Sequence, residues 1–199
     1  MPDDSERIWT PANVVTLTRI LLIPVFVAAL LSPWPTWFPE PQFWIDWQPW
    51  IAAAVFVIIS TTDAIDGYLA RSRNEVTDLG KFLDPVADKL LTLSAFIMLI
   101  QQGLMPAWAT VIILARELCV DGLRMVAVTK GQVIAAGKLG KIKTVFQIVL
   151  ILWLMLLRQP ATQSLLSGAL CLVVVVMTLW SGADYFVKNS GVLMEKDAK

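Results

Sequence analysis

Residues 165–187 read LLSGALCLVVVVMTLWSGADYFV, an apolar run long enough to cross a lipid bilayer as one helix. Five earlier stretches have a similar length and composition, and they lie at about 14–31, 50–70, 82–100, 107–128 and 142–157. A spanning helix needs about 20 residues. The sequence therefore predicts an all-α, polytopic membrane protein with six transmembrane helices in one domain over residues 1–199.

The composition agrees with a membrane protein. Of the 199 residues, 57% are hydrophobic and 16% are charged, and the mean hydropathy is +0.67, whereas about a quarter of the residues of an average soluble domain are charged. The 16 basic and 16 acidic residues cancel, so no basic excess favours nucleic acid. Histidine is absent, which excludes His-dependent catalytic triads and HExxH zinc sites. Cys119 and Cys171 lie in apolar runs and indicate no disulfide framework.

The Lys and Arg residues predict the topology. With six spans, both termini lie on the same side of the membrane. Twelve of the 16 basic residues fall on that side, in the tails or around the second and fourth loops, and only Arg158 falls on the opposite side. Because cytoplasmic loops carry the excess of Lys and Arg, we expect both termini in the cytoplasm and the protein in the inner (cytoplasmic) membrane.

The stretch 32–50 has no Lys or Arg and contains five of the nine tryptophans and five prolines. Indole rings favour the headgroup region of a membrane. We expect this stretch to be a connector that lies along the outer interface.

Four aspartates, Asp63, Asp66, Asp84 and Asp88, lie near the second loop. On helices, 63 and 66 share one face and 84 and 88 share another, so two antiparallel helices with a short loop can bring the four carboxylates together. Facing lipid, four such charges would cost on the order of 10 kcal/mol. The sequence therefore predicts a polar, hydrated cavity that faces the cytoplasm.

Carboxylates without His or Cys are hard oxygen ligands that suit Mg²⁺, Mn²⁺ or Ca²⁺, and four of them suit two divalent ions. Gly67 and Ala70 keep the helix face between the carboxylates small, and Arg71 can donate two hydrogen bonds to a phosphate. This combination favours phosphoryl-group chemistry.

The pattern Asp-x2-Asp-Gly-x2-Ala-Arg-x8-Gly-x3-Asp-x3-Asp fills eight fixed positions in 26 residues, from Asp63 to Asp88. It resembles the signature of the CDP-alcohol phosphotransferases. The resemblance implies a six-helix membrane enzyme, usually a homodimer, that transfers a substituted phosphoryl group from a CDP-linked donor to an alcohol and releases CMP.

The resemblance also implies roles for individual residues. Asp63, Asp66 and Asp84 would hold two divalent ions, Mg²⁺ or Mn²⁺, and Asp88 would both contact the metal and act as the general base. The nucleotide would lie against Asp66 and against Gly67, Ala70, Arg71 and Gly80, with Asn13 and Arg19 at its border.

Two further regions resemble the bacterial members that use sn-glycerol 3-phosphate as the acceptor: Asn13–Arg19, and Ala115–Leu118 together with Gly140–Thr144. This implies CDP-diacylglycerol as the donor, and phosphatidylglycerophosphate and CMP as the products. A patch of positive charge near spans four and five suits an acceptor that carries a phosphate. Its predicted members are Arg116, Arg124, Lys138, Lys141 and Lys143.

Other interpretations stay open at this point. The lysines can set topology or contact anionic lipids, and Arg116 can belong to a buried ion pair with Glu117 beside it. Asn13 can be a helix cap, and Arg19 an anchor whose charged end reaches water. The acceptor can instead be inositol phosphate, serine or phosphatidylglycerol, and intramembrane aspartates also occur in cation transporters.

Overall fold

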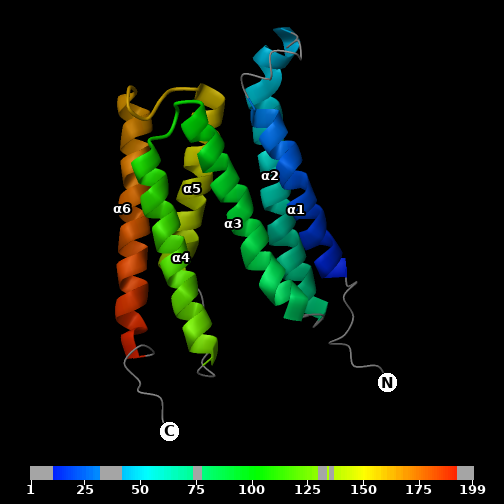
Figure 1. The fold of residues 1–199 in the computed structure, drawn as a ribbon, viewed down its shortest axis with the longest axis vertical. Coiled ribbons are helices and arrows are strands. Elements are labelled where there is room, and N and C mark those ends of the chain that lie inside the picture. Colours follow the sequence, from blue (N-terminus) through cyan, green and yellow to red (C-terminus); the bar gives the residue numbers. More distant parts are fainter. Residues whose placement is uncertain (1–10, 32–41, 74–77, 130–133, 135–136, 192–199) are drawn as a thin grey trace. The chain divides into compact units, whose positions relative to one another are not determined.

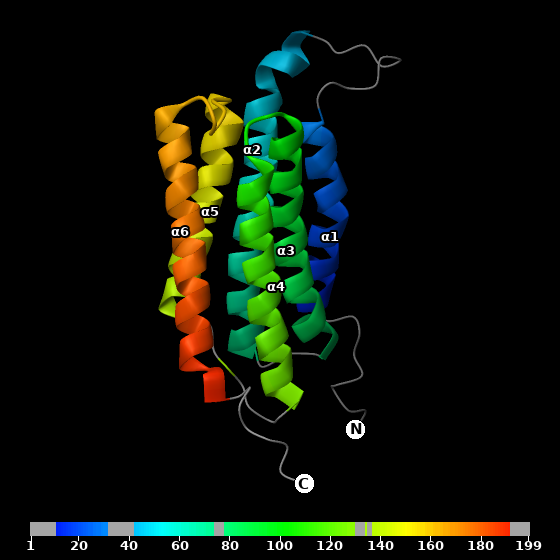
Figure 2. The same ribbon diagram turned by 60° about the vertical axis from the view of Figure 1, so that its left-hand side comes forward.

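The protein, described from a computed structural model, is built of helices (Figures 1 and 2). The structure describes the backbone of residues 11–31, 42–73, 78–129, 134 and 137–191, and the side chains of 14–31, 46–62, 86, 87, 89–128, 134, 137 and 139–191. Within these residues there is no strand, and the helices are α1 (Pro11–Leu30), α2 (Gln42–Arg73), α3 (Asp78–Gln101), α4 (Ala107–Thr129), α5 (Lys138–Leu157) and α6 (Leu165–Lys188).

Each predicted span corresponds to one of these helices, so the all-α class is confirmed. Four helices begin before the predicted spans. α2 begins at Gln42 rather than near residue 50, and α1, α3 and α5 begin at Pro11, Asp78 and Lys138 rather than at 14, 82 and 142. Hydropathy finds where a helix is apolar and not where it starts, and Pro49 lies inside α2 although proline usually marks a helix start.

The predicted bounds of the connector over 32–50 are therefore partly wrong, and its position along the outer interface stays a prediction. Its residues 42–50 are the first turns of α2 and continue directly into the apolar part of that helix (Figure 1). Its residues 32–41 lie outside the described part of the chain.

Two described helical segments, Leu139–Leu157 and Leu165–Lys188, are long and apolar enough to cross a membrane. α6 also buries small and polar side chains, such as Ser167, Thr178 and Ser181, while Leu172, Val176 and Leu179 are exposed. A helix of a water-soluble protein shows the opposite arrangement. An outer surface of this kind suits lipid, and the count of six membrane spans stays a prediction.

The chain divides into two compact units, Met1–Met98 and Leu99–Lys199, and the single domain over 1–199 stays a prediction. In the first unit α1 packs on α2. The rings of Phe26 and Phe56 are fully buried between them, with their centroids 5.6 Å apart. The side-chain amide of Gln48 donates a hydrogen bond of 2.9 Å to the carbonyl of Leu31, just after the last turn of α1. This bond satisfies a carbonyl that the end of the helix leaves without a helical partner.

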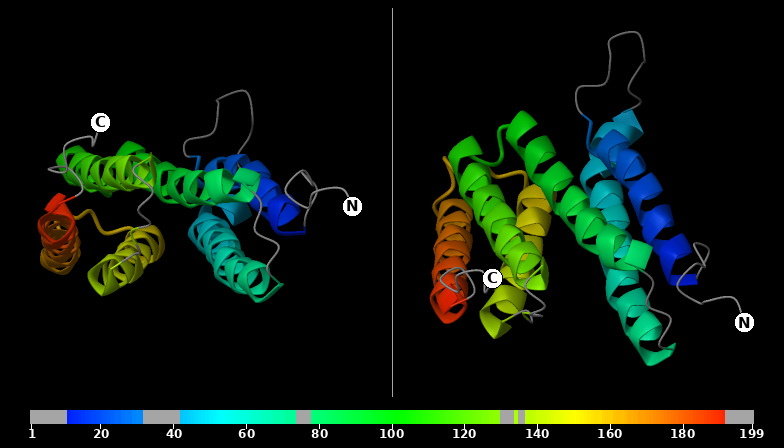
Figure 3. Two further views of the ribbon diagram at one scale, coloured as in Figure 1. Left: turned by 90° about the horizontal axis from the view of Figure 1, so that it is seen from below. Right: turned by 60° about the horizontal axis from the view of Figure 1, so that its bottom comes forward.

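In the second unit α6 packs on both α4 and α5 (Figure 3). α4 and α6 run in the same direction, and α5 runs in the opposite one (Figure 1). A small apolar cluster of Val120, Leu123 and Tyr185 joins α4 to α6. α6 is thus the central helix of the packing within this unit.

The loops of the second unit are tied to each other. The amide of Ala161, in the α5–α6 loop, donates to the carbonyl of Leu104, in the α3–α4 loop, at 2.9 Å. Gly103 has a φ of 71°, which glycine adopts without strain at the end of α3. Gly168, in the first turn of α6, lies so close to the α5–α6 loop that an added Cβ would be 2.7 Å from the carbonyl oxygen of Ala161.

We expect Gly168→Ala to lower the free energy of unfolding by about 1–3 kcal/mol, because the new methyl group collides with a backbone atom that the Leu104 bond holds in place. Thermal unfolding of the purified protein in detergent measures the effect. Gly122→Ala is the matched control, since nothing lies within 4 Å of the Cβ added there. Equal midpoints for the two variants would contradict the close packing of Gly168.

Candidate active site

The aspartate signature lies on two helices of the first unit. Residues 63–71 belong to α2 and residues 80–88 belong to α3, so the predicted helical backbone is confirmed on both sides of the loop. α2 ends at Arg73 and α3 begins at Asp78, which keeps these two helix ends within about 18 Å of each other. The two helices run in opposite directions (Figure 1). The backbone thus has the antiparallel arrangement that the predicted site needs.

The signature side chains themselves lie outside the described residues, and their roles stay predictions. They are Asp63, Asp66, Gly67, Ala70, Arg71, Gly80, Asp84 and Asp88. Helical backbone places 63 and 66 on one face of α2, and 84 and 88 on one face of α3. A donor set made only of carboxylates at these register positions fits Mg²⁺ or Mn²⁺.

The two other residues predicted at the nucleotide border lie in α1. The side chain of Asn13 is outside the described residues. Arg19 is 3% exposed, and Thr16, one turn before it, is also buried. An anchor of the snorkelling kind keeps its guanidinium in water, whereas Arg19 is enclosed by protein.

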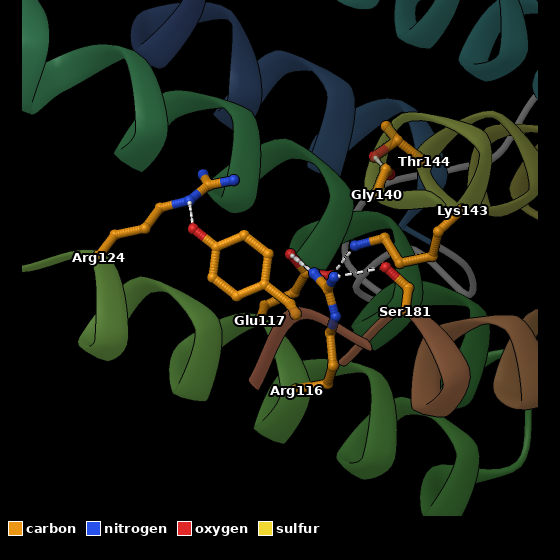
Figure 4. A network of polar contacts seen from close by, with 8 residues as sticks. Arg116, Glu117, Arg124, Gly140, Lys143, Thr144 and Ser181 are labelled. Atoms are coloured by element: carbon orange, nitrogen blue, oxygen red, sulfur yellow. Dashed lines mark hydrogen bonds and ion pairs between the residues drawn. The ribbon is translucent and has the colours of Figure 1, made fainter. Parts of the chain in front are cut away.

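The second unit contains a network of polar contacts that links charged side chains of α4 and α5 to a hydroxyl of α6 (Figure 4). Glu117 on α4 forms ion pairs with Lys143 on α5 and with Arg116, its own neighbour on α4, the latter at 3.5 Å. The second terminal nitrogen of Arg116 donates to the hydroxyl of Ser181 on α6 at 2.7 Å. The network therefore brings together two members of the predicted acceptor patch, Arg116 and Lys143.

These charges are largely removed from solvent. The side chain of Lys143 is 3% exposed, that of Arg116 is 10% exposed and that of Glu117 is 22% exposed. Charges with so little access to water need partners, and Glu117 supplies a partner to both cations. Nε of Arg116 is buried with no hydrogen-bond partner among the described residues. Arg116 therefore retains a donor for a further acceptor.

Arg124 lies two turns further along α4 and also contacts α6. Its Nε donates to the phenol oxygen of Tyr185 at 3.0 Å, and its guanidinium carbon lies 5.4 Å from the centre of the Tyr185 ring. Tyr185 is buried, so it holds one edge of the guanidinium and leaves the terminal nitrogens for other partners.

The remaining predicted members of the acceptor patch lie on α5. Lys141 is exposed, and it is two residues from Lys143, so the two side chains leave the helix on different sides. The side chain of Lys138 is outside the described residues. Thr144, from the same resembling stretch, donates back to the carbonyl of Gly140 within α5 at 3.2 Å.

Sequence reasoning missed the residues of α6. Ser181, Gly182 and Tyr185 contact the two arginines of α4, yet they lie after Thr144, where the last of the resembling regions ends. The available signal was a cluster of small and polar residues near the end of an apolar run, where lipid-facing positions would be aliphatic.

Comparison with known proteins agrees with the predicted resemblance. The family model described as CDP-alcohol phosphatidyltransferase matches residues 9–180. A protein of Bacillus subtilis is 46% identical over 180 residues, which cover 89% of this chain and 93% of the relative. A protein of Escherichia coli K12 is 36% identical over 179 residues, which cover 87% and 91%.

A protein of Salmonella typhimurium is 35% identical over 190 residues, which cover 92% of this chain and 97% of the relative. All three relatives carry the name CDP-diacylglycerol–glycerol-3-phosphate 3-phosphatidyltransferase. Both the family model and these relatives extend over most of the chain, and they confirm the resemblance that the aspartate pattern predicted. The chain belongs to the CDP-alcohol phosphatidyltransferase family.

Proposed function

We propose that the protein transfers the phosphatidyl group of CDP-diacylglycerol to sn-glycerol 3-phosphate and releases phosphatidylglycerophosphate and CMP. The observation that carries this proposal is the 46% identity, over 89% of the chain, to a relative whose name states this donor and this acceptor. The complete aspartate pattern on α2 and α3 supports the same reaction.

In the proposed reaction the 1-hydroxyl oxygen of the acceptor forms a bond to the lipid-bearing phosphorus. The bond from that phosphorus to the bridging oxygen breaks, and its electron pair leaves with CMP. Asp88 takes the proton of the hydroxyl, and a carboxylate placed close to the attacking oxygen is suited to that task. Atoms and charges balance without any further reactant.

The metal and nucleotide sites are assigned to the first unit. Asp63, Asp66, Asp84 and Asp88 would hold two ions of Mg²⁺ or Mn²⁺, which would neutralise the charge of the diphosphate as CMP leaves. Arg71 would donate to a phosphate of the nucleotide. The small positions Gly67, Ala70 and Gly80, with Asn13 and Arg19 at the border, would admit the cytidine part.

The acceptor site is assigned to the second unit. Arg116 and Lys143 lie together around Glu117, and Arg116 retains an N–H that would donate to the phosphate of sn-glycerol 3-phosphate. Arg124, Lys138 and Lys141 would add positive charge nearby. The contact of Arg116 with Glu117 does not remove this capacity, because Nε of Arg116 has no hydrogen-bond partner among the described residues.

The proposal includes a place in the cell. The protein would be a multi-pass protein of the inner membrane, with both termini and the active site on the cytoplasmic side. The water-soluble acceptor sn-glycerol 3-phosphate would enter the site from the cytoplasm. The distribution of Lys and Arg supports this orientation. A homodimer among membrane lipids is part of the same proposal and rests on the family resemblance.

The reaction is tested by CMP release from the purified protein in detergent with CDP-diacylglycerol and Mg²⁺ or Mn²⁺. We expect release with sn-glycerol 3-phosphate and none with inositol phosphate, serine or phosphatidylglycerol. We also expect a chelator to stop the release and added metal to restore it. Release with another acceptor would refute the assigned acceptor, and metal-dependent ion flux without CMP release would refute the transferase.

We expect Asp66→Asn to lower kcat by about 10²-fold or more, since a lost metal ligand removes several kcal/mol of charge stabilisation from the transition state. The control is Asp46→Asn, which removes an exposed carboxylate from the other end of α2. If Asp66→Asn and the control had similar kcat values, the proposed metal site would be refuted.

We expect Arg116→Gln to raise the KM for sn-glycerol 3-phosphate about ten- to a hundredfold, because a hydrogen bond to a charged group contributes about 1.5–3 kcal/mol. The KM for CDP-diacylglycerol should stay the same. Arg158→Gln, at an exposed arginine that ends α5, is the matched control. An unchanged KM in Arg116→Gln would show that Arg116 is only a structural ion-pair partner.

A further inference from the structure

The C-terminal half of α6 contacts both arginines that α4 contributes to the proposed acceptor site. Ser181 accepts a hydrogen bond of 2.7 Å from Arg116, and Tyr185 accepts one of 3.0 Å from Arg124. Ser181 and Tyr185 are four residues apart, so they lie on the same face of α6. One helix face thus determines where two guanidinium groups point.

A glycine on α6 lets Arg116 pass close to the helix. A Cβ added to Gly182 would lie 3.0 Å from Cγ of Arg116 and 3.7 Å from its Nε. The aliphatic part of the arginine therefore packs directly against the α6 backbone. Any larger residue at 182 would push the arginine at its stem, and the guanidinium at the far end would move with it.

The partners on α6 are neutral, and this matters for the charge. A hydroxyl fixes the direction of a guanidinium without cancelling its positive charge, whereas a carboxylate would do both. Ser181 and Tyr185 each use one N–H of an arginine, and Nε of Arg116 stays without a hydrogen-bond partner among the described residues. Both arginines are thus held in place and can still bind an anion.

We propose that Ser181, Gly182 and Tyr185 are positioning residues for the acceptor's phosphate, acting through Arg116 and Arg124. This inference rests on the proposed function. The three residues lie just beyond residue 180, where the match to the family model ends. They favour acceptors that carry a phosphate over acceptors that do not, because only a phosphate uses the arginines they orient.

The first test removes the hydroxyl of Ser181. We expect Ser181→Ala to raise the KM for sn-glycerol 3-phosphate about tenfold, the effect of one lost hydrogen bond to a charged group. The kcat and the KM for CDP-diacylglycerol should stay close to those of the wild type. Ser181→Thr keeps a hydroxyl and should restore most of the affinity. Ser167→Ala is the matched control, since Ser167 is also a serine of α6 that accepts a hydrogen bond from another helix, from the indole of Trp153 on α5 at 3.1 Å.

The second test leaves every hydrogen-bonding group in place. Gly182→Ala adds only the methyl group that meets the stem of Arg116, so we expect a raised KM for sn-glycerol 3-phosphate, and a larger rise for Gly182→Val. Gly122→Ala in α4, with nothing within 4 Å of its new Cβ, is the control and should keep the wild-type KM. KM does not depend on the amount of active enzyme, so partial loss of folded protein does not hide the effect.

The outcomes separate this inference from the proposed function. A wild-type protein that releases no CMP with sn-glycerol 3-phosphate would overturn the proposed function. An active wild type whose Ser181→Ala and Gly182→Ala variants keep its KM for the acceptor would overturn the positioning role alone. A fall in kcat with an unchanged KM would also overturn it, because it would mean that α6 acts only in the stability of the fold. If Ser181→Ala gives no folded protein, Gly182→Ala decides.

Discussion

The second unit depends on one constraint: a charge placed between apolar helices must have a partner. Lys143 and Arg116 are removed from water, and Glu117 is the carboxylate that both of them contact. Removing one partner of a buried ion pair costs about 3–5 kcal/mol. A shift between α4 and α5 that separates Lys143 from Glu117 is therefore unfavourable. Ser181 adds α6 to the same contact. The unit therefore keeps these polar groups inside, while aliphatic side chains such as Leu172 and Val176 are exposed.

The two kinds of chemistry in the proposed reaction are carried by different parts of the chain. The carboxylates belong to helices of the first unit and are suited to metal ions and, through them, to the diphosphate of the donor. The buried cations belong to the second unit and are suited to the phosphate of the acceptor. The acceptor can thus change within such a fold by substitutions in α4 to α6 alone, while the carboxylate pattern stays the same.

The sequence predicted the features that depend on residues close together in the chain. Six apolar runs predicted six helices, and the aspartate pattern predicted two antiparallel helices with a short loop, which the structure shows as α2 and α3 joined by four residues. It did not predict where α2 begins, because hydropathy cannot tell an exposed helix from a loop. It also missed Ser181 and Tyr185, whose partners are 65 and 61 residues away. Nothing local distinguishes a serine that holds an arginine from one that only fills a small space between helices.

The bond between Ala161 and Leu104 has a consequence for how this chain can vary. It fixes the loop before α6 to the loop before α4. The position of each residue along and around these two helices then depends on its distance in sequence from the loop. One residue inserted between Ala161 and Ser181 would turn Ser181 by about 100° around α6 and move it by about 1.5 Å along the axis. The hydroxyl would then face away from Arg116. We conclude that this part of the chain accepts substitutions on its outer side far more readily than any change in length.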